Sequence, residues 1–471
     1  MTLLIARFFF WGVVSCMKIL VFSTNSNFFD ESLSHVQIPS NQFFWERLAL
    51  RFPDDEIIVA TQKPGMFLLD VRGKSVLNTD VSSGGKTSVR FEIIEADDEG
   101  EIADVLASFS PDVAISATFY VTPLDWLSIK DSLVAQKLSE KGIRTISHPL
   151  GVSVDCFDKW RTHQMLERFG FCVAKAVYVH HELFINGGNR REIKSNVYRS
   201  SVLAQVERLH FPVVVKDTVG LSSYGMDVLD DFFQVRDFLK SKRFTSDRII
   251  EEYIHGFQFG AEIYSREGFH EVQPPFIFSV NKYGITSPKQ SVKIGPVSSP
   301  RFNLSELSSE LLRLARCLNL SGISQVDLVF SEEAQKWYII EINPRLSGMT
   351  TTYAVMRQES VFETLVSLAR PFEKVPEKTG GNFPGLVVNI KFPLLSEPIL
   401  CELSGLPFVR FVHQVENKAA KQLRERGYCE VILVGSSKRE LLDNLSFLRA
   451  KFASCIEENF VETAEKLLFL V

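Results

Sequence analysis

The sequence predicts a protein of mixed α/β and α+β structure built in three parts. Residues 17–150 alternate short apolar runs with polar helical stretches, which is typical of a parallel, Rossmann-like sheet with helices on its faces. Near Gly151 the pattern changes to apolar runs that end in Lys, Asp or Glu. The last part, 385–471, has strand-like runs before a long helical stretch, which indicates a small α+β domain.

Length and composition limit the functional classes. The 471 residues suffice for about three domains, and 45% apolar with 23% charged residues is an ordinary globular composition. The formal charge of −5 gives no reason to expect a nucleic-acid partner. The seven Cys include no C-x-x-C pair, which favours reduced thiols and a cytoplasmic location. The His residues lack the spacing of a zinc site.

The first sixteen residues resemble a short signal sequence, with a lipoprotein-like cleavage site before Cys16 as one interpretation. The apolar run is too short to span a bilayer. Met17 opens MKILVFSTNS, which predicts a buried strand with no linker before it. We therefore expect Met17 to be the initiator and the protein to have no membrane partner.

The expected elements follow in chain order. Ser82 to Thr87, SSGGKT, resembles the end of a P-loop, but Asp occupies position 80 and no strand precedes it, so we expect a polar loop. After Gly151, helical stretches are expected from 158 to about 170 and from 305 to 318. The expected strands lie at 19–22, 57–60, 91–94, 113–116, 211–216, 325–330, 337–343, 408–413 and 429–434, with a helix at 438–452, and the segment 249–256 is expected to be a strand that ends in a turn.

Two neighbouring strands carry acidic residues in apolar surroundings. Glu341 and Asn343 share one strand face because successive side chains alternate, and Arg345 joins them if the strand persists past Pro344. A hairpin centred near Ala334 would place Asp327 opposite Glu341, whereas a centre half a residue away would separate them. A polar, solvated hairpin face is the alternative interpretation, but VDLVF and WYIIEIN favour burial. Buried acids need a cation, and oxygen ligands of this kind suit Mg²⁺.

Two further segments are suited to nucleotide binding. FPVVVK ends in Lys216 and precedes the Gly/Ser loop 220–225, whose backbone N–H groups could cover phosphates; a plain turn is equally compatible. IIEEYIHG, 249–256, offers a strand end that could hydrogen-bond an adenine ring, and a simple turn is again the alternative.

In this order, these motifs resemble the ATP-grasp superfamily over about residues 150–370. The resemblance implies a pre-ATP-grasp domain at 17–150, an ATP-grasp domain at 151–375 with a lid subdomain at about 205–256, and a C-terminal domain at 385–471. It also implies roles for single residues. These are phosphate contacts by Lys159, Lys216, Ser222 and Ser223; adenine contacts by Glu251, Glu252 and Ile254; ribose contact at Gln258; metal ligation by Asp327, Glu341 and Asn343; and catalysis by Arg345 with Lys216.

The implied reaction uses ATP and Mg²⁺, with Mn²⁺ as an alternative ion, to activate a carboxylate as its acyl-phosphate and join it to an amine. Gln325 stands where D-alanine–D-alanine ligases carry Arg, and the tail is longer than theirs. The tail is similar to those of L-amino-acid ligases and biotin carboxylases, so small acids and amines are the expected partners. A biotin- or ribotide-type carboxylase and a non-catalytic ATP-binding regulator are the alternatives, and a homodimer is compatible with either.

Two segments near these motifs are candidates for substrate contact. Ser347 to Thr352, SGMTTT, follows the metal strand and is expected to border the acyl substrate. The tract 279–300, with Lys282, Lys289 and Lys293, either binds phosphate or substrate or is a solvated loop. Cys156 is expected to be a buried structural thiol.

Overall fold

A computed structural model describes most of the chain. The described residues are 16–24, 33–36, 44–62, 71–72, 75–76, 89–117, 127–186, 195–219, 226–280, 291–370, 385–417, 427–456 and 458–471. Residues 1–15, the loop 82–87 and the loop 220–225 with Ser222 and Ser223 lie outside them, as do Lys282 and Lys289.

The N-terminal part is a parallel five-stranded sheet in the order β6-β3-β1-β7-β8. The four strands expected from the apolar runs are all present in it, and β8 is added at one edge. Both faces of these strands are buried, which explains why their sequences are continuous apolar runs and not alternating ones. The bounds are β1 (Lys18–Ser23), β3 (Glu56–Gln62), β6 (Val89–Ile94), β7 (Val113–Ser116), β8 (Arg144–Ile146), α1 (Phe44–Arg51), α2 (Glu99–Ser108) and α3 (Leu127–Glu140), with a small hairpin of β4 (Val71–Arg72) and β5 (Ser75–Val76).

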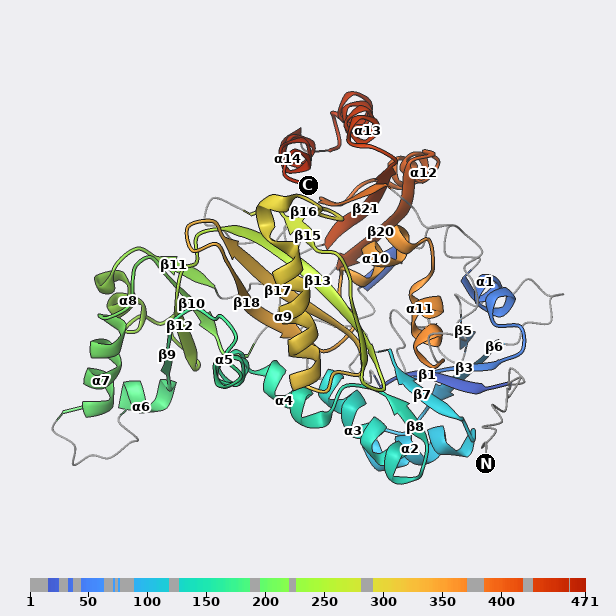
Figure 1. Cartoon of the computed structure of the whole chain (residues 1–471), viewed down its shortest axis with the longest axis horizontal. Coiled ribbons are helices and arrows are strands. Elements are labelled where there is room, and N and C mark those ends of the chain that lie inside the picture. The colour runs from blue at the N-terminus through green and yellow to red at the C-terminus, as the bar shows by residue number, and fades with distance from the viewer. Residues whose placement is uncertain are drawn as a thin grey trace, which may run out of the picture.

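A second, antiparallel sheet of four strands has the order β11-β10-β12-β9 and lies on the left in Figure 1. Alternate residues of its central strands, such as Val213, Val215 and Ile250, pack on helices α7 and α8. The other face is therefore left for Lys216. The bounds are β9 (Ala176–Val179), β10 (Val213–Asp217), β11 (Asp227–Leu229), β12 (Arg248–Glu252), α6 (His181–Asn186), α7 (Val197–Val206) and α8 (Phe232–Phe238).

The largest sheet has ten strands in the order β18-β17-β13-β15-β16-β19-β21-β20-β2, with β14 paired to β13. One face packs on α9, whose Leu307, Leu311 and Leu314 follow helical spacing, and on the C-terminal helices α12 to α14. The strands are β2 (Leu33–Val36), β13 (Phe257–Arg266), β14 (Phe269–Val272), β15 (Phe276–Phe278), β16 (Val292–Gly295), β17 (Gly322–Ser331), β18 (Lys336–Asn343), β19 (Leu386–Phe392), β20 (Val409–Asn417) and β21 (Gly427–Gly435). The helices are η2 (Pro300–Phe302), α9 (Leu304–Cys317), α10 (Thr350–Arg357), α11 (Val361–Leu368), α12 (Glu397–Ser404), α13 (Lys438–Phe452) and α14 (Glu458–Leu468).

The C-terminal strands continue the central sheet, because β19 pairs with β16 and β21 pairs with β19. Strand β2, from the N-terminal part of the sequence, completes the far edge by pairing with β20. The fold class is mixed α/β and α+β, as expected. The division into domains at 150, 375 and 385 stays a prediction.

Two short helices connect the three sheets. Helices α4 (Leu150–Phe157) and α5 (Lys159–Arg168) both contact β18, and the Lys159 N–H donates to the Thr218 carbonyl directly after β10 at 2.7 Å. Figure 1 shows α5 between the four-stranded sheet and the central sheet. Side chains at the start of α5 can therefore face both sheets.

Candidate functional site

The hairpin of β17 and β18 brings the expected metal ligands together. Asp327 pairs with Glu341 and Gln325 pairs with Asn343, so all four side chains lie on one face. Between Asp327 and the next residue the register shifts by a β-bulge. Of the two registers considered from the sequence, the observed one is that centred near Ala334, which places Asp327 opposite Glu341.

Burial and a neighbouring charge both act on Asp327. Burial, and secondly the charge of Glu341, raise the pKa of Asp327 to about 6. Gln325 bridges two of the expected ligands, because its Nε2 donates to Asp327 Oδ1 at 2.6 Å and its Oε1 accepts from Asn343 Nδ2 at 2.8 Å. The amide thereby fixes the orientation of both side chains.

Arg345 reaches the same face by a different route from the one expected. Strand β18 ends at Asn343, and a turn follows in which the Arg345 N–H donates to the Asn343 carbonyl at 2.8 Å. The condition stated for Arg345, a strand that persists past Pro344, is therefore not met. The guanidinium nevertheless returns to the site, where Nη2 donates to Asn343 Oδ1 at 3.0 Å.

Helix α5 sets two basic residues against the acids of both sheets. Lys159 Nζ lies 3.5 Å from Glu341 Oε1, which links the helix to the metal strand. Lys216 is 4% exposed, and its Nζ lies 2.5 Å from Glu251 Oε2 on the neighbouring strand. His163, one helical turn after Lys159, has Nδ1 3.8 Å from Glu251 Oε1, and burial lowers its pKa. Sequence reasoning missed His163, although its i+4 spacing from Lys159 was a usable signal.

The expected adenine-side residues point in different directions. Glu251 faces Lys216, whereas the Glu252 carboxylate accepts from the N–H and the ring of His210 at 3.0 and 2.9 Å. The backbone N–H groups of Glu252 and Tyr253 already donate to carbonyls at 2.9 and 3.0 Å. Within the described part of the chain the Ile254 N–H has no backbone acceptor, which leaves it as the donor open to a purine ring.

Gln258 lies on β13 two residues before Gly260, which pairs with Asp327. It therefore shares the face of the sheet that carries the acids, away from Glu252. Its contact with a ribose stays a prediction. Ser222 and Ser223 lie outside the described residues, so their contact with phosphate also stays a prediction.

A buried carboxylate on the strand next to β17 was not foreseen. Glu262 on β13 is 0% exposed and accepts hydrogen bonds from Thr350 Oγ1 at 2.6 Å, Tyr264 Oη at 3.0 Å and Ser347 Oγ at 3.3 Å. Burial raises its pKa to about 7, although these hydroxyls oppose the shift. Glu262 thus fastens the start of the SGMTTT segment to the face of the sheet.

The donor set fits a hard divalent cation. Asp327, Glu341 and Asn343 supply oxygen atoms only, and two facing carboxylates repel unless a cation lies between them. Among the residues that the structure describes, no group of three or more His, Cys, Asp and Glu is placed to hold a metal. The arrangement suits an ion such as Mg²⁺ that shares its coordination with substrate oxygens and water.

The sequence profile of the ATP-grasp domain matches residues 156–349. This range contains every candidate residue named above from Lys159 to Arg345. The matched range is less than half of the chain. The hairpin of β17 and β18, strands β10 and β12, and helix α5 all lie within it.

Similar proteins extend the comparison beyond the domain. A carbamoyl-phosphate synthase of Methanobrevibacter smithii is 22% identical over 141 residues, which are 30% of this chain and 38% of that protein. The chain thus spans less than two fifths of this curated relative. An N5-carboxyaminoimidazole ribonucleotide synthetase solved with ADP has a TM-score of 0.60 at 16% identity, covering 93% of this chain and 97% of that one. The structure of an L-amino acid ligase from Bacillus licheniformis has a TM-score of 0.60 at 15% sequence identity. The match covers 93% of this chain and 98% of that one.

These similarities show that the fold of those two proteins extends over 93% of this chain. Among the helices that the structure describes, none has the length and apolar character needed to cross a membrane.

Proposed function

We propose that the protein is an ATP-dependent, ADP-forming carboxylate–amine ligase acting on an amino acid or a peptide-like acid. The observation that carries the proposal is the pairing of Asp327 with Glu341 beside three cationic side chains, Lys159, Lys216 and Arg345. Acids that could hold a cation and bases that could hold phosphate are what phosphoryl transfer requires. The similarity to an L-amino acid ligase over 93% of the chain supports the choice of reaction.

In the proposed reaction, a substrate carboxylate oxygen attacks the γ-phosphorus of ATP, the bond to the bridging oxygen breaks, and ADP leaves. The amine nitrogen of the second substrate then attacks the acyl carbon, phosphate departs, and the nitrogen loses a proton as the amide forms. Asp327, Glu341 and Asn343 would hold Mg²⁺, which supplies charge neutralisation for the phosphates when bound.

The chain's own groups bind and orient the reactants. Lys159 and Lys216 are held by Glu341 and Glu251, so their ammonium groups are already aimed at the space between the two sheets. Arg345 is fixed by its bond to Asn343 and would steady the transferred phosphoryl group. Positioning and charge neutralisation of this kind need no side-chain nucleophile.

Release of ADP in the presence of added acid and amine tests the proposal. We expect ADP formation to require both substrates, and Glu341→Gln to reduce it by at least about 100-fold, because one metal-binding charge is lost. Glu333→Gln, in the exposed turn of the same hairpin, is the matched control and should behave like the wild type. ATP binding without turnover over a broad panel of acids and amines would instead favour a regulatory ATP-binding protein.

A carboxylase is the second candidate, because the N5-carboxyaminoimidazole ribonucleotide synthetase has the same TM-score of 0.60. In that case bicarbonate is the carboxylate that becomes phosphorylated. Stimulation of ADP release by bicarbonate together with biotin or an aminoimidazole ribotide, but not by amino acids, would identify this reaction.

A further inference from the structure

A second group of charged and amide side chains lies on the same face of the central sheet as the metal ligands. Lys293 on β16 pairs with Phe278 on one side and with Asn389 on the other. Phe278 pairs with Gln258, which is two residues from Gly260, the partner of Asp327. Paired residues of antiparallel strands share a face, so Lys293 and Asn389 face the space in front of the acids.

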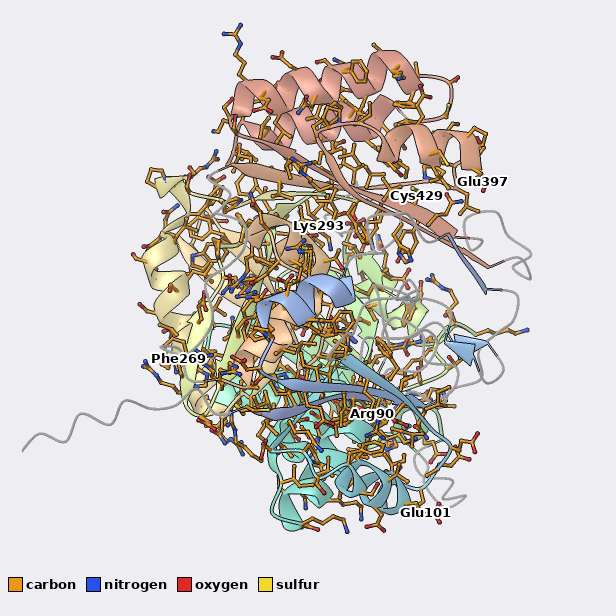
Figure 2. The ribbon with its side chains drawn as sticks, turned by 90° about the vertical axis from the view of Figure 1, so that its right-hand side faces the viewer. Arg90, Glu101, Phe269, Lys293, Glu397 and Cys429 are labelled. Atoms are coloured by element: carbon orange, nitrogen blue, oxygen red, sulfur yellow. The ribbon has the colours of Figure 1, made fainter. Side chains whose placement is uncertain are left out.

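Lys293 interacts with acids only at a distance within the described part of the chain, where the charges of Glu430, Asp327 and Glu262 favour its protonated form. Among the residues that the structure describes, its ammonium forms no ion pair or hydrogen bond, and it lies 4.8 Å from the centre of the Phe278 ring. Burial, and secondly the charge of Lys391, lower the pKa of Lys293 to about 8. The residue as a whole is half-buried. Figure 2 labels Lys293 where the C-terminal strands meet the rest of the molecule.

Lys391 adds positive charge next to the segment that follows the metal strand. Its side chain is 5% exposed, and its Nζ lies 3.9 Å from the point where a Cβ on Gly348 would stand. Gly348 follows Ser347, which Glu262 holds. The acid Glu430, opposite Lys391 on β21, accepts from Asn389 at 2.8 Å.

Asn389 presents a buried acceptor. The residue is 0% exposed, and its Nδ2 donates to Thr352 Oγ1 at 2.6 Å and to the Glu430 carboxylate. Because a carboxylate only accepts, the nitrogen must face Glu430, and this fixes the direction of the amide oxygen. Within the described part of the molecule that oxygen has no hydrogen-bond donor. Leaving a buried acceptor unpaired is unfavourable.

We infer that Lys293 and Asn389 form a recognition site for an α-amino acid, with Lys391 contributing positive charge. The ammonium of Lys293 binds the amino acid's carboxylate, and Asn389 Oδ1 accepts a hydrogen bond from its α-amino group. Lys293 and Asn389 are paired on adjacent strands. This arrangement suits an α-amino acid, because its carboxylate and its amino group are attached to the same carbon. The inference rests on the proposed function, because it names the class of substrate for the same site.

Binding of each of the twenty protein L-amino acids, measured by calorimetry with Mg²⁺ and ADP present, tests the site. We expect at least one to bind, and its analogues lacking either the amino or the carboxylate group to bind at least about tenfold more weakly. Lys293→Met should weaken binding by a similar factor, and Lys293→Arg should restore part of it. Lys336→Met, an exposed lysine on the same sheet, is the control.

Unchanged ADP affinity and thermal midpoint in Lys293→Met would show that the variant folds. Equal affinity of a binding amino acid for the wild type and Lys293→Met would overturn the inference, as would binding of none of the twenty. If the analogue that lacks the amino group binds as tightly as the amino acid itself, Asn389 is not part of the site. These binding measurements are independent of ADP release. A ligase that uses a different class of substrate would still form ADP, and Glu341→Gln would still reduce that ADP formation.

Discussion

Gln325 shows how a single side chain can determine the geometry of a site without touching the reactants. It donates to Asp327 and accepts from Asn343, at 2.6 and 2.8 Å. We expect Gln325→Met to raise the Mg²⁺ concentration needed for half-maximal ADP formation by about 10–100-fold, as loss of a residue that orients metal ligands commonly does. A magnesium titration of ADP release measures this. An unchanged requirement would mean that the strands alone orient Asp327 and Asn343.

Glu262 is the residue from which we expect a pH effect on stability. Its folded pKa of about 7 lies above the ordinary carboxyl value of 4.5, so the folded state binds the proton more tightly than the unfolded state. The wild type therefore loses stability as pH rises from about 4.5 to 7, by up to about 3 kcal/mol for this shift. Glu262→Gln should lack this loss.

Urea unfolding at several pH values checks the prediction by the difference between the two proteins, in which other titrating groups cancel. The free energy of unfolding of Glu262→Gln should increase relative to that of the wild type as the pH rises from about 4.5 to 7. A difference that stays constant with pH would show that Glu262 keeps an ordinary pKa.

At the scale of the element, strand β13 needs a glycine where it passes beneath an aromatic ring. A Cβ on Gly260 would lie 2.3 Å from the Phe278 ring, and the same position pairs with Asp327. We expect Gly260→Ala to lower the free energy of unfolding by about 1–3 kcal/mol through overpacking. Phe278→Leu in the same chain should recover part of that loss, so the two changes should be non-additive in a double-mutant cycle.

The elements themselves were largely predictable, because apolar runs and helical spacing reflect burial. Helix α13 begins and ends where its sequence indicates, and β7 does as well. The register of β17 and β18 was not predictable, since parity permitted two pairings and the bulge that decides between them depends on tertiary packing. Glu251 and Glu252 point in opposite directions because successive side chains alternate along a strand. The sequence alone does not show this, since the bounds of β12 must be known first.

At the scale of the whole molecule, the sequence could not show that distant segments share one sheet. Lys293, Asn389 and Asp327 are far apart in the chain and meet on one face only because β19 pairs with β16. In the sequence, the tract containing Lys293 supports a binding segment and a solvated loop equally, and only the structure shows that Lys293 itself lies on a strand paired with β15 and β19. Long-range strand pairing leaves no local pattern in the residues that it brings together.

The N-terminal sheet is fastened to the segment directly after helix α11 by a buried ion pair, which gives the last prediction. Arg370, directly after α11, is 5% exposed and pairs with Asp55, which is 2% exposed; Arg370 Nε lies 3.1 Å from Asp55 Oδ2. Arg370→Met leaves a buried carboxylate unpaired, so we expect a loss of about 3–5 kcal/mol in unfolding free energy. Lys18→Met, which breaks the neighbouring exposed pair with Glu56, should cost at most about 1 kcal/mol. Chemical unfolding measures both, and equal losses would mean that the Arg370 pair contributes no more than a surface contact.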